Sequence, residues 1–252
     1  MYPDVVTRVL VIEDHPDVLE MMTLLLQNGG YNVVAAETSA RAERTLEKGG
    51  FDLVLADLML EELNVDASWT TIDQFVDLAR PAPVGLLTAW PVKPDDGPRH
   101  DLAFVLRKPC SRIQLFEQLA STLMLPGLDA TQEDRLRAYF RCIEQGAYDE
   151  VGALCTEDVV YRLPGTDPRF AREIRGRREF VAFTAQTFQA FQSPHFELGA
   201  MRPLPKGALV EYIGRWQSAD GMTSEMPGAV MFEFRDNLFS RIQVRVDTDE
   251  LK

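Results

Sequence analysis

The first half of the chain alternates between short apolar runs and amphipathic segments. Continuous apolar runs of this length are typical of strands that are buried on both faces of a parallel sheet. The runs cover residues 8–12, 31–36, 51–56, 83–88 and 104–107. Between them, apolar residues recur every three or four positions, which indicates helices after His15, after Ser39, around Phe75 and from about Ser111 to Leu125. The alternation predicts an α/β unit with a five-stranded parallel sheet covered by helices.

The pattern changes after Pro126 and Gly127. Two helical segments, a strand, a third helix and three further strands are predicted in that order. They cover residues 132–146, 148–155, 159–163, 177–191, 209–217, 229–235 and 239–246. Helices followed by consecutive strands predict an α+β domain with a curved antiparallel sheet. We therefore expect one domain over residues 1–126, a linker over 127–131 and a second domain over 132–252.

Length and charge narrow the possible functions. With 252 residues, the chain is long enough for two domains of this size. Its net charge of -13 opposes binding to the phosphate backbone of a nucleic acid. No apolar run approaches the roughly 18 residues of a membrane-spanning helix, and the first residues lack the pattern of a secretory signal. We expect a cytoplasmic protein that binds neither nucleic acid nor membranes, with its three cysteines reduced.

Polar side chains follow the carboxyl ends of four predicted strands. Glu13 and Asp14 follow the first strand, Asp57 the third, Thr88 the fourth and Lys108 the fifth. Because these strand ends meet at one edge of a parallel sheet, the five side chains are expected to lie together. Clustered carboxylates repel one another unless a cation is present, and Mg²⁺ prefers such oxygen ligands. The pattern predicts a site where Mg²⁺ and an ammonium group neutralise an incoming phosphoryl group while one carboxylate acts as the nucleophile.

Four short segments resemble the receiver domain of two-component response regulators over about residues 7–125. These segments are Val11-Ile12-Glu13-Asp14, Leu55-Ala56-Asp57, Leu87-Thr88-Ala89 and Arg107-Lys108-Pro109. The resemblance implies a flavodoxin-like fold in which Asp57 accepts a phosphoryl group from a histidine kinase or phosphotransfer protein. It also implies that Asp14, Asp57 and the backbone carbonyl of Met59 bind Mg²⁺, with Glu13 acting mainly through water. Thr88 would then hydrogen-bond a phosphoryl oxygen, and Lys108 would pair with the phosphoryl charge.

Two segments depart from the receiver pattern. Glu61 and Val65 stand where the family usually has Pro and Gly, so we expect a reshaped loop after Asp57. The prolines at positions 91, 94 and 98 cannot all lie inside one helix. The fourth helix of the receiver fold is therefore expected to be short or missing.

The switch position of the family also differs. Three residues before Lys108, where the family has an aromatic side chain, the sequence has Val105. Phe104 is one residue away and is expected to point to the opposite side of the strand. Trp90 is a candidate substitute for the missing aromatic group.

From about residue 131 to 251, the second half resembles the cone-shaped fold of nuclear transport factor 2, ketosteroid isomerase and the SnoaL-like polyketide cyclases. The segments that carry the resemblance include Leu136-Arg137-Ala138-Tyr139-Phe140, Glu157-Asp158-Val159-Val160 and Arg175-Gly176-Arg177. The fold implies an apolar pocket between sheet and helices, with Tyr139, Tyr161, Trp216 and Phe232 as candidate lining residues. A core filled by these side chains fits the pattern equally well.

The catalytic residues of the isomerases are only partly present. Tyr139 matches their donor tyrosine, but Leu163 and Val230 stand where a base and a second acid would be needed. Isomerase chemistry is therefore not expected, and a cyclase-type pair using Asp247 or His195 stays open. A basic cluster at residues 169–178 is interpreted as a solvated loop, with a phosphate or acidic-partner site as the alternative.

The leading hypothesis is a response regulator that is phosphorylated on Asp57 with Mg²⁺. Its SnoaL-like output domain would act without binding DNA, through homodimer formation, contact with a partner or binding of a small apolar ligand. One alternative is a phosphorylation-controlled cyclase or isomerase-like enzyme. Another is a degenerate receiver that serves as a protein-binding scaffold.

Overall fold

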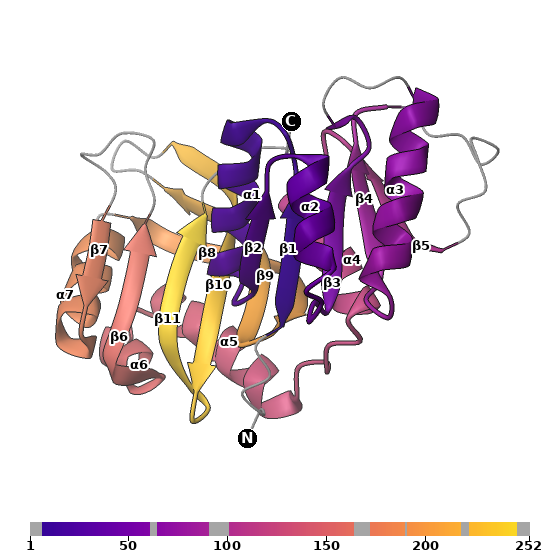
Figure 1. Ribbon diagram of the computed structural model, residues 1–252. Coiled ribbons are helices and arrows are strands. Elements are labelled where there is room, and N and C mark those ends of the chain that lie inside the picture. The colour runs from indigo at the N-terminus through magenta and orange to yellow at the C-terminus, as the bar shows by residue number, and fades with distance from the viewer. Residues whose placement is uncertain are drawn as a thin grey trace. The chain divides into compact units, whose positions relative to one another are not determined.

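The computed structural model describes residues 7–60, 65–90, 101–163, 172–189, 191–217 and 222–245 (Figure 1). The described residues fold into two units, one on each side of the boundary between Leu125 and Pro126. Each unit contains its own β-sheet, with five strands in the first and six in the second. Among the described helices, none combines the length and the apolar character that crossing a membrane would require.

The sheet of the first unit is parallel, and its strands follow the order β2-β1-β3-β4-β5. The strands are β1 (Arg8–Ile12), β2 (Asn32–Ala36), β3 (Leu53–Asp57), β4 (Val84–Thr88) and β5 (Leu102–Arg107). Ile12 is in register with Ala36 on β2 and Ala56 on β3, so the carboxyl ends of these strands lie at one edge. This is the flavodoxin-like arrangement expected from the sequence, and it confirms that the five apolar runs form strands.

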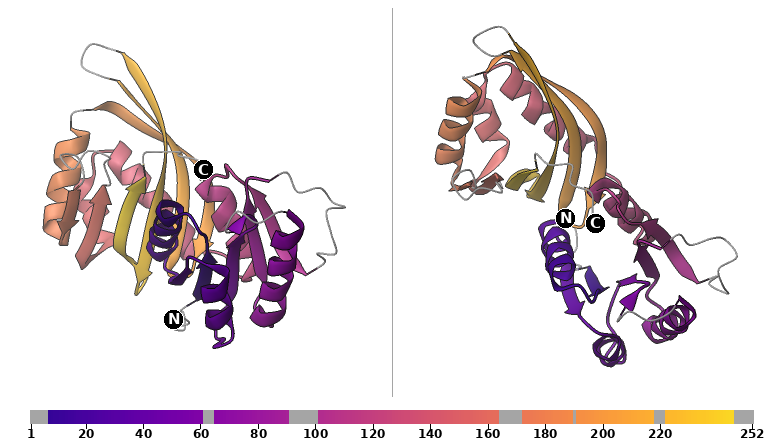
Figure 2. Two further views of the ribbon diagram at one scale, coloured as in Figure 1. Left: turned by 45° about the horizontal axis from the view of Figure 1, so that its top comes forward. Right: turned by 90° about the horizontal axis from the view of Figure 1, so that it is seen from above.

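Within the described part of this unit, four helices cover the two faces of the sheet. They are α1 (Pro16–Asn28), α2 (Ser39–Leu46), α3 (Val65–Ala79) and α4 (Arg112–Thr122). Helices α2 and α3 lie on one face, and α1 and α4 lie on the other (Figure 2, right). On the first face, Leu46 from α2 and Phe75 from α3 pack in one cluster with strand residues such as Leu10, Val54 and Leu86.

Side chains outside the helices cap α2 and α4. The sequence pattern placed the start of α2 after Ser39, but the helix begins at Ser39 and its cap is Thr38, whose Oγ1 accepts a hydrogen bond from the Arg41 amide at 3.2 Å. Thr38 has an extended backbone, which a cap requires, whereas Ser39 already belongs to the helix. Ser111 and Gln114 form a reciprocal capping box at the start of α4.

Two predictions for the first unit fall outside the described residues. The reshaped loop was expected near Glu61, and residues 61–64 are not described. The short or missing fourth helix was expected between β4 and β5, where residues 91–100 are not described.

The described residues of the second unit form three helices and a curved six-stranded sheet. The helices are α5 (Ala130–Glu144), α6 (Tyr148–Ala153) and α7 (Arg177–Phe188). The strands are β6 (Cys155–Leu163), β7 (Arg172–Arg175), β8 (Gln192–Leu204), β9 (Gly207–Gln217), β10 (Thr223–Arg235) and β11 (Leu238–Arg245). Figure 2 shows the sheet curving around the helices of this unit. Helix α5 begins at Ala130, two residues before its predicted start, because Asp129 and Gln132 form a capping box.

The sheet is curved and largely antiparallel, as the sequence predicted, with one parallel pair that was not predicted. Its order is β7-β6-β11-β10-β9-β8, and β11 runs parallel to β6 whereas the other pairs are antiparallel. Strands β6 and β11 are far apart in the sequence, so no hairpin turn forces them to run in opposite directions. The result is a cone-shaped fold with one parallel pair near its middle.

Strand β8 was not predicted, and it is irregular. Its pairing with β9 shifts register between Gln192 and His195 and again between Leu198 and Met201. Ser193 has a positive φ of 49°, and the strand also contains Pro194 and Pro203. Each shift breaks the alternation of inward and outward side chains by which a strand is recognised in a sequence.

Candidate functional site

The carboxyl edge of the first sheet brings an ammonium group between two carboxylates. The Lys108 Nζ donates to Asp57 Oδ2 at 2.6 Å and to Glu13 Oε2 at 2.7 Å. The exposed fractions of these side chains are 8% for Lys108, 12% for Asp57 and 5% for Glu13. Three of the five side chains predicted to converge are therefore in direct contact in a nearly buried cluster.

A backbone amide holds the second oxygen of each carboxylate. The Met59 amide donates to Asp57 Oδ1 at 3.1 Å, and the His15 amide donates to Glu13 Oε1 at 3.3 Å. In both cases the amide comes two residues after the carboxylate, where the chain turns away from the end of its strand. The local backbone thereby sets the orientation of both acidic groups toward Lys108.

Burial and charge act in opposite directions on the two partners. Burial raises the pKa of Glu13, and the hydrogen bond and charge of Lys108 offset only part of this increase. Burial alone would lower the pKa of Lys108, but the neighbouring Asp57 and Glu13 carboxylates raise it overall. Lys108 is therefore a permanent cation at neutral pH and neutralises negative charge at this edge.

Thr88 lies at the end of the neighbouring strand and is fully buried. Its Oγ1 accepts a hydrogen bond from the Trp90 amide at 3.0 Å, and its carbonyl oxygen accepts one from the Lys108 amide at 2.7 Å. The second bond joins the ends of β4 and β5, so Thr88 and Lys108 are held side by side through their backbones.

The two residues near the switch position lie on opposite sides of β5, as expected. Val105 is 42% exposed, whereas Phe104 is 8% exposed and its ring covers Gly85. Trp90 is 43% exposed. A switching role for Trp90 stays a prediction.

The donor atoms at this edge suit a hard divalent cation. Among the described residues, no three His, Cys, Asp or Glu side chains gather closely enough to form a complete protein-only metal site. Mg²⁺ usually binds through one or two carboxylates and keeps several waters, so it does not need such a set. Asp14, which follows Glu13 in the chain, is half-buried. That it binds Mg²⁺ together with Asp57 and the backbone carbonyl of Met59 stays a prediction. The residues present therefore fit Mg²⁺.

The candidate pocket residues of the second unit pack as a core. Tyr139, Tyr161 and Phe232 belong to one buried cluster, and the Tyr139 ring lies 5.1 Å from that of Phe232. Burial raises the pKa of Tyr139 well above its ordinary value, so its hydroxyl stays protonated at neutral pH. Trp216 instead packs against Phe191, with ring centroids 5.0 Å apart. This arrangement fits the filled core, which was the alternative to a ligand pocket.

The polar candidate of the second unit that the structure describes, His195, is in a surface ion pair. His195 is 65% exposed, and its Nδ1 lies 2.9 Å from Glu144 Oε1, an atom that also accepts from the Phe196 amide. Asp247, its proposed alternative, lies outside the described residues. A cyclase-type pair that uses Asp247 or His195 stays a prediction.

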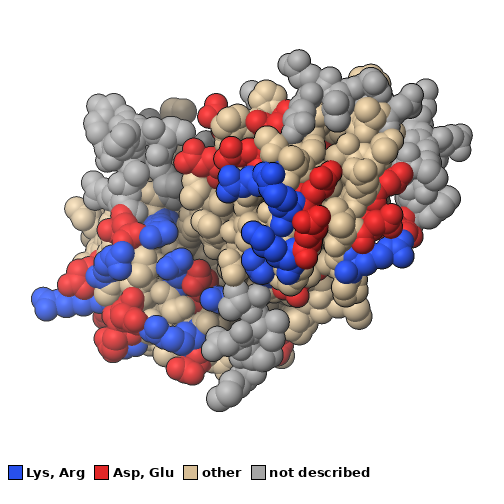
Figure 3. All heavy atoms as spheres, viewed as in Figure 1, with Lys and Arg blue, Asp and Glu red and all other residues tan. Residues whose placement is uncertain are grey.

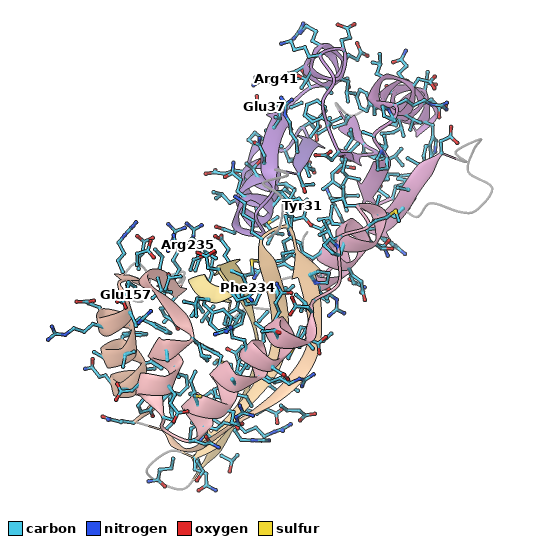
Figure 4. All side chains as sticks on the ribbon, turned by 90° about the horizontal axis from the view of Figure 1, so that it is seen from below. Tyr31, Glu37, Arg41, Glu157, Phe234 and Arg235 are labelled. Carbon is cyan, nitrogen blue, oxygen red and sulfur yellow. The ribbon has the colours of Figure 1, made fainter. Side chains whose placement is uncertain are left out.

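The predicted basic cluster is interleaved with acidic residues. Arg175 lies 2.5 Å from Glu173, and Arg177 lies 2.6 Å from Glu157. Figure 4 labels Glu157 and, at the end of β10, Arg235, which pairs with Asp158 in the same way. The neighbouring Phe234 is also labelled, and its ring lies 5.4 Å from that of Phe239.

The same mixing of charges is visible on a larger scale. On the face shown in Figure 3, Lys and Arg side chains of the described residues lie next to Asp and Glu side chains. Arg169 and the side chain of Arg172 are outside the described part of the chain. The arginines that are described support the interpretation of a solvated, charge-compensated surface.

One contact near the site was not found by sequence reasoning. The Ser68 hydroxyl on α3 donates to the Sδ of Met59 at 3.8 Å, and Met59 follows Asp57 by two residues. A single serine in an amphipathic helix carries no signal of such a role, because the contact depends on how α3 packs over the sheet.

Comparisons with known proteins agree with this architecture. The sequence model of the response regulator receiver domain matches residues 9–120, and that of the SnoaL-like domain matches residues 136–242. The transcriptional regulatory protein GlrR of Escherichia coli K12 is 30% identical over 236 residues, which cover 86% of this chain and 51% of GlrR. The chain thus spans about half the length of the curated relatives it matches.

Two solved structures are similar to parts of the chain. A CheY-like receiver domain from Methanospirillum hungatei JF-1 is 19% identical and covers 47% of this chain and 94% of its own, with a TM-score of 0.43. An NTF2-like protein of unknown function from Exiguobacterium sp. 255-15 is 19% identical and covers 46% of this chain and 99% of its own, with a TM-score of 0.40. Strand order, site and sequence matches together identify the chain as a response regulator receiver domain fused to a SnoaL-like domain.

Proposed function

We propose that the receiver domain accepts a phosphoryl group on Asp57 from a phosphohistidine of a histidine kinase or phosphotransfer protein. An Asp57 carboxylate oxygen attacks phosphorus, the phosphorus–nitrogen bond of the donor breaks, and the imidazole leaves with its electron pair. The observation that carries this proposal is the position of the Lys108 ammonium group, within 2.6 Å of Asp57 at a nearly buried sheet edge.

Lys108 has a different task before and after transfer. In the unmodified protein it neutralises Asp57 and Glu13, which are otherwise close enough to repel each other. After transfer it lies within reach of the phosphoryl oxygens and offsets their charge. Mg²⁺, when bound by Asp14, Asp57 and the Met59 carbonyl, supplies further charge neutralisation for the incoming group.

Thr88 provides the link between the phosphoryl group and the rest of the domain. Its hydroxyl is held by the Trp90 amide, so a new bond to a phosphoryl oxygen would pull on the segment that follows β4. Because this segment leads to the exposed Trp90, a small movement of the buried hydroxyl would change the surface of the receiver.

The second domain is proposed to transmit this signal without binding DNA and without catalysis. The matched relatives are named as transcriptional regulators, but the chain covers only about half of their length. Support comes from the net charge of -13 and from the acidic partners of Arg175 and Arg177. The packed rings around Tyr139 favour output through a homodimer or a partner protein over turnover of a substrate.

The phosphorylation proposal is tested with acetyl phosphate and Mg²⁺. We expect mass spectrometry to detect one phosphoryl group on the wild-type chain and none on Asp57→Asn. Asp77→Asn, which removes an exposed carboxylate on α3, serves as the matched control and should be phosphorylated like the wild type. Modification of Asp57→Asn to the wild-type extent would refute Asp57 as the acceptor, and an unmodified wild type would favour the degenerate-scaffold alternative.

The output proposal is tested on the same phosphorylated sample. Sedimentation of the phosphorylated and unmodified chains should differ if the signal alters self-association. Tight binding of either form to mixed-sequence duplex DNA at physiological salt would contradict an output domain that does not bind DNA.

A further inference from the structure

The segment after Asp57 is anchored by two buried leucines. Leu58 and Leu60 are each 1% exposed and pack in the cluster beneath α2 and α3. Met59, between them in the chain, is half-buried. No proline occurs between residues 58 and 65, so no proline ring restrains the backbone of this segment.

Met59 itself is held at two points. Its amide donates to Asp57 Oδ1 at 3.1 Å, and its Sδ accepts from the Ser68 hydroxyl at 3.8 Å. Ser68 is 1% exposed and belongs to α3, whose buried face packs on the sheet. A thioether is a weak acceptor, but the bond is shielded from water on the serine side. The contact ties a rigid helix to the residue that follows the phosphoacceptor by two positions.

We infer that Ser68 is a positioning residue for Mg²⁺, acting through Met59. The Met59 carbonyl belongs to the peptide group that joins Met59 to Leu60. Because Met59 is held by its amide and side chain and Leu60 is buried in the core, this peptide group has little freedom, and its carbonyl oxygen is held in place. That oxygen is the backbone donor to Mg²⁺ in the proposed function, on which this inference rests. A carbonyl that is already in place loses less conformational entropy when the cation binds.

The test is a double-mutant cycle on Mg²⁺ affinity in the full chain, measured by titration calorimetry with Mg²⁺ alone. Ser68→Ala removes the donor, and Met59→Leu removes the acceptor while keeping a side chain of similar volume. Each change should raise the Kd for Mg²⁺ about two- to fivefold, the range expected for one modest hydrogen bond. The double variant should bind no more weakly than the weaker single variant, because both changes remove the same contact.

A matched control and a second measurement separate positioning from general damage. Thr71→Val removes a hydroxyl from the same helix, one that donates to the Ala67 carbonyl and not to Met59, and should leave the Kd unchanged. In metal-free protein, the Met59 amide should exchange with solvent faster in Ser68→Ala than in the wild type. If Ser68→Ala does not fold, Met59→Leu tests the same contact from the half-buried side and must still weaken Mg²⁺ binding.

The outcomes distinguish this inference from the proposed function. A wild-type Kd in Ser68→Ala or Met59→Leu would overturn the role of Ser68, as would fully additive effects in the double variant. Absence of Mg²⁺ binding to the wild type would overturn both the inference and the metal-dependent proposal. Mg²⁺ binding and Asp57 phosphorylation in the wild type with an additive cycle would overturn only the inference.

Discussion

Replacing Lys108 by Met removes the cation that Glu13 and Asp57 share while keeping an unbranched side chain of similar length. Both carboxylates are almost buried, with exposed fractions of 5% and 12%, so water cannot fully replace the ammonium group. Removing one partner of a buried ion pair typically costs about 3–5 kcal/mol. Because burial already raises the pKa of Glu13, this residue can take up a proton, which removes part of the repulsion between the two carboxylates. We therefore expect the lower end, about 3 kcal/mol at neutral pH.

The assay is urea unfolding followed by tryptophan fluorescence. In a Trp216→Phe background, Trp69 and Trp90 report on the receiver domain alone. With a slope of about 1–3 kcal/mol per molar urea, a loss of about 3 kcal/mol lowers the midpoint by about 1–3 M. Lys48→Met removes an exposed lysine and should stay within about 0.5 kcal/mol of the parent.

Two further measurements decide whether charge is the cause. Added Mg²⁺ should restore part of the lost stability of Lys108→Met, since a ligand that binds only the folded state stabilises it. Adding Asp57→Asn to Lys108→Met should also restore stability, because one uncompensated charge disappears. Unfolding of Lys108→Met at the parent's urea concentration would refute the idea that this lysine neutralises a repulsive pair.

Three other predictions test packing and local structure. Burial raises the pKa of Cys155 from 9.0 to about 12, so the stability that its buried thiol contributes is intact below pH 9 and is lost as the pH rises toward 12. In urea titrations, the free energy of unfolding of Cys155→Ala should therefore fall by about 1 kcal/mol less between pH 8 and pH 10 than that of the wild type. Equal losses in the two proteins would contradict this. Gly85→Ala places a methyl group 2.3 Å from the Phe104 ring and should lower the free energy of unfolding by about 1–3 kcal/mol, measured by thermal melts. Adding Phe104→Leu should recover part of this loss. An unchanged melting temperature in Gly85→Ala would rule out the tight contact. Asp129→Ala removes the α5 cap and should lower the free energy of unfolding by about 1 kcal/mol. Asp129→Ser keeps a capping oxygen and should leave the stability nearly unchanged. Equal losses in the two variants would argue against the cap.

The receiver half could be predicted well because its signals are local. A strand buried on both faces appears as an unbroken apolar run, and the residue after each run lies at the edge where ligands collect. This logic placed Glu13, Asp57 and Lys108 at one edge. It could not show that one ammonium group contacts both carboxylates, because side-chain conformations depend on burial and on amides such as those of His15 and Met59.

The second half could be predicted less completely because its pairing is long-range. The inward positions of β9 and β10 follow a regular alternation, and Val210 and Val230 face each other as that pattern requires. The parallel pairing of β6 with β11 leaves no local trace, since the two strands are joined by most of the domain. Strand β7 has only four residues, too few for a recognisable period.

The irregular shape of strand β8 bears on whether molecules of this protein aggregate at high concentration. It is the last strand in the order of its sheet, so one of its edges has no neighbour within the described sheet. An unbroken edge of thirteen residues would be a template on which a strand from another molecule could grow. Pro194 and Pro203 have no amide proton to offer, and the two shifts of register twist the strand out of a flat alignment. The prolines and register shifts that make β8 hard to recognise in the sequence thus also oppose the pairing of this edge strand with a strand of another molecule.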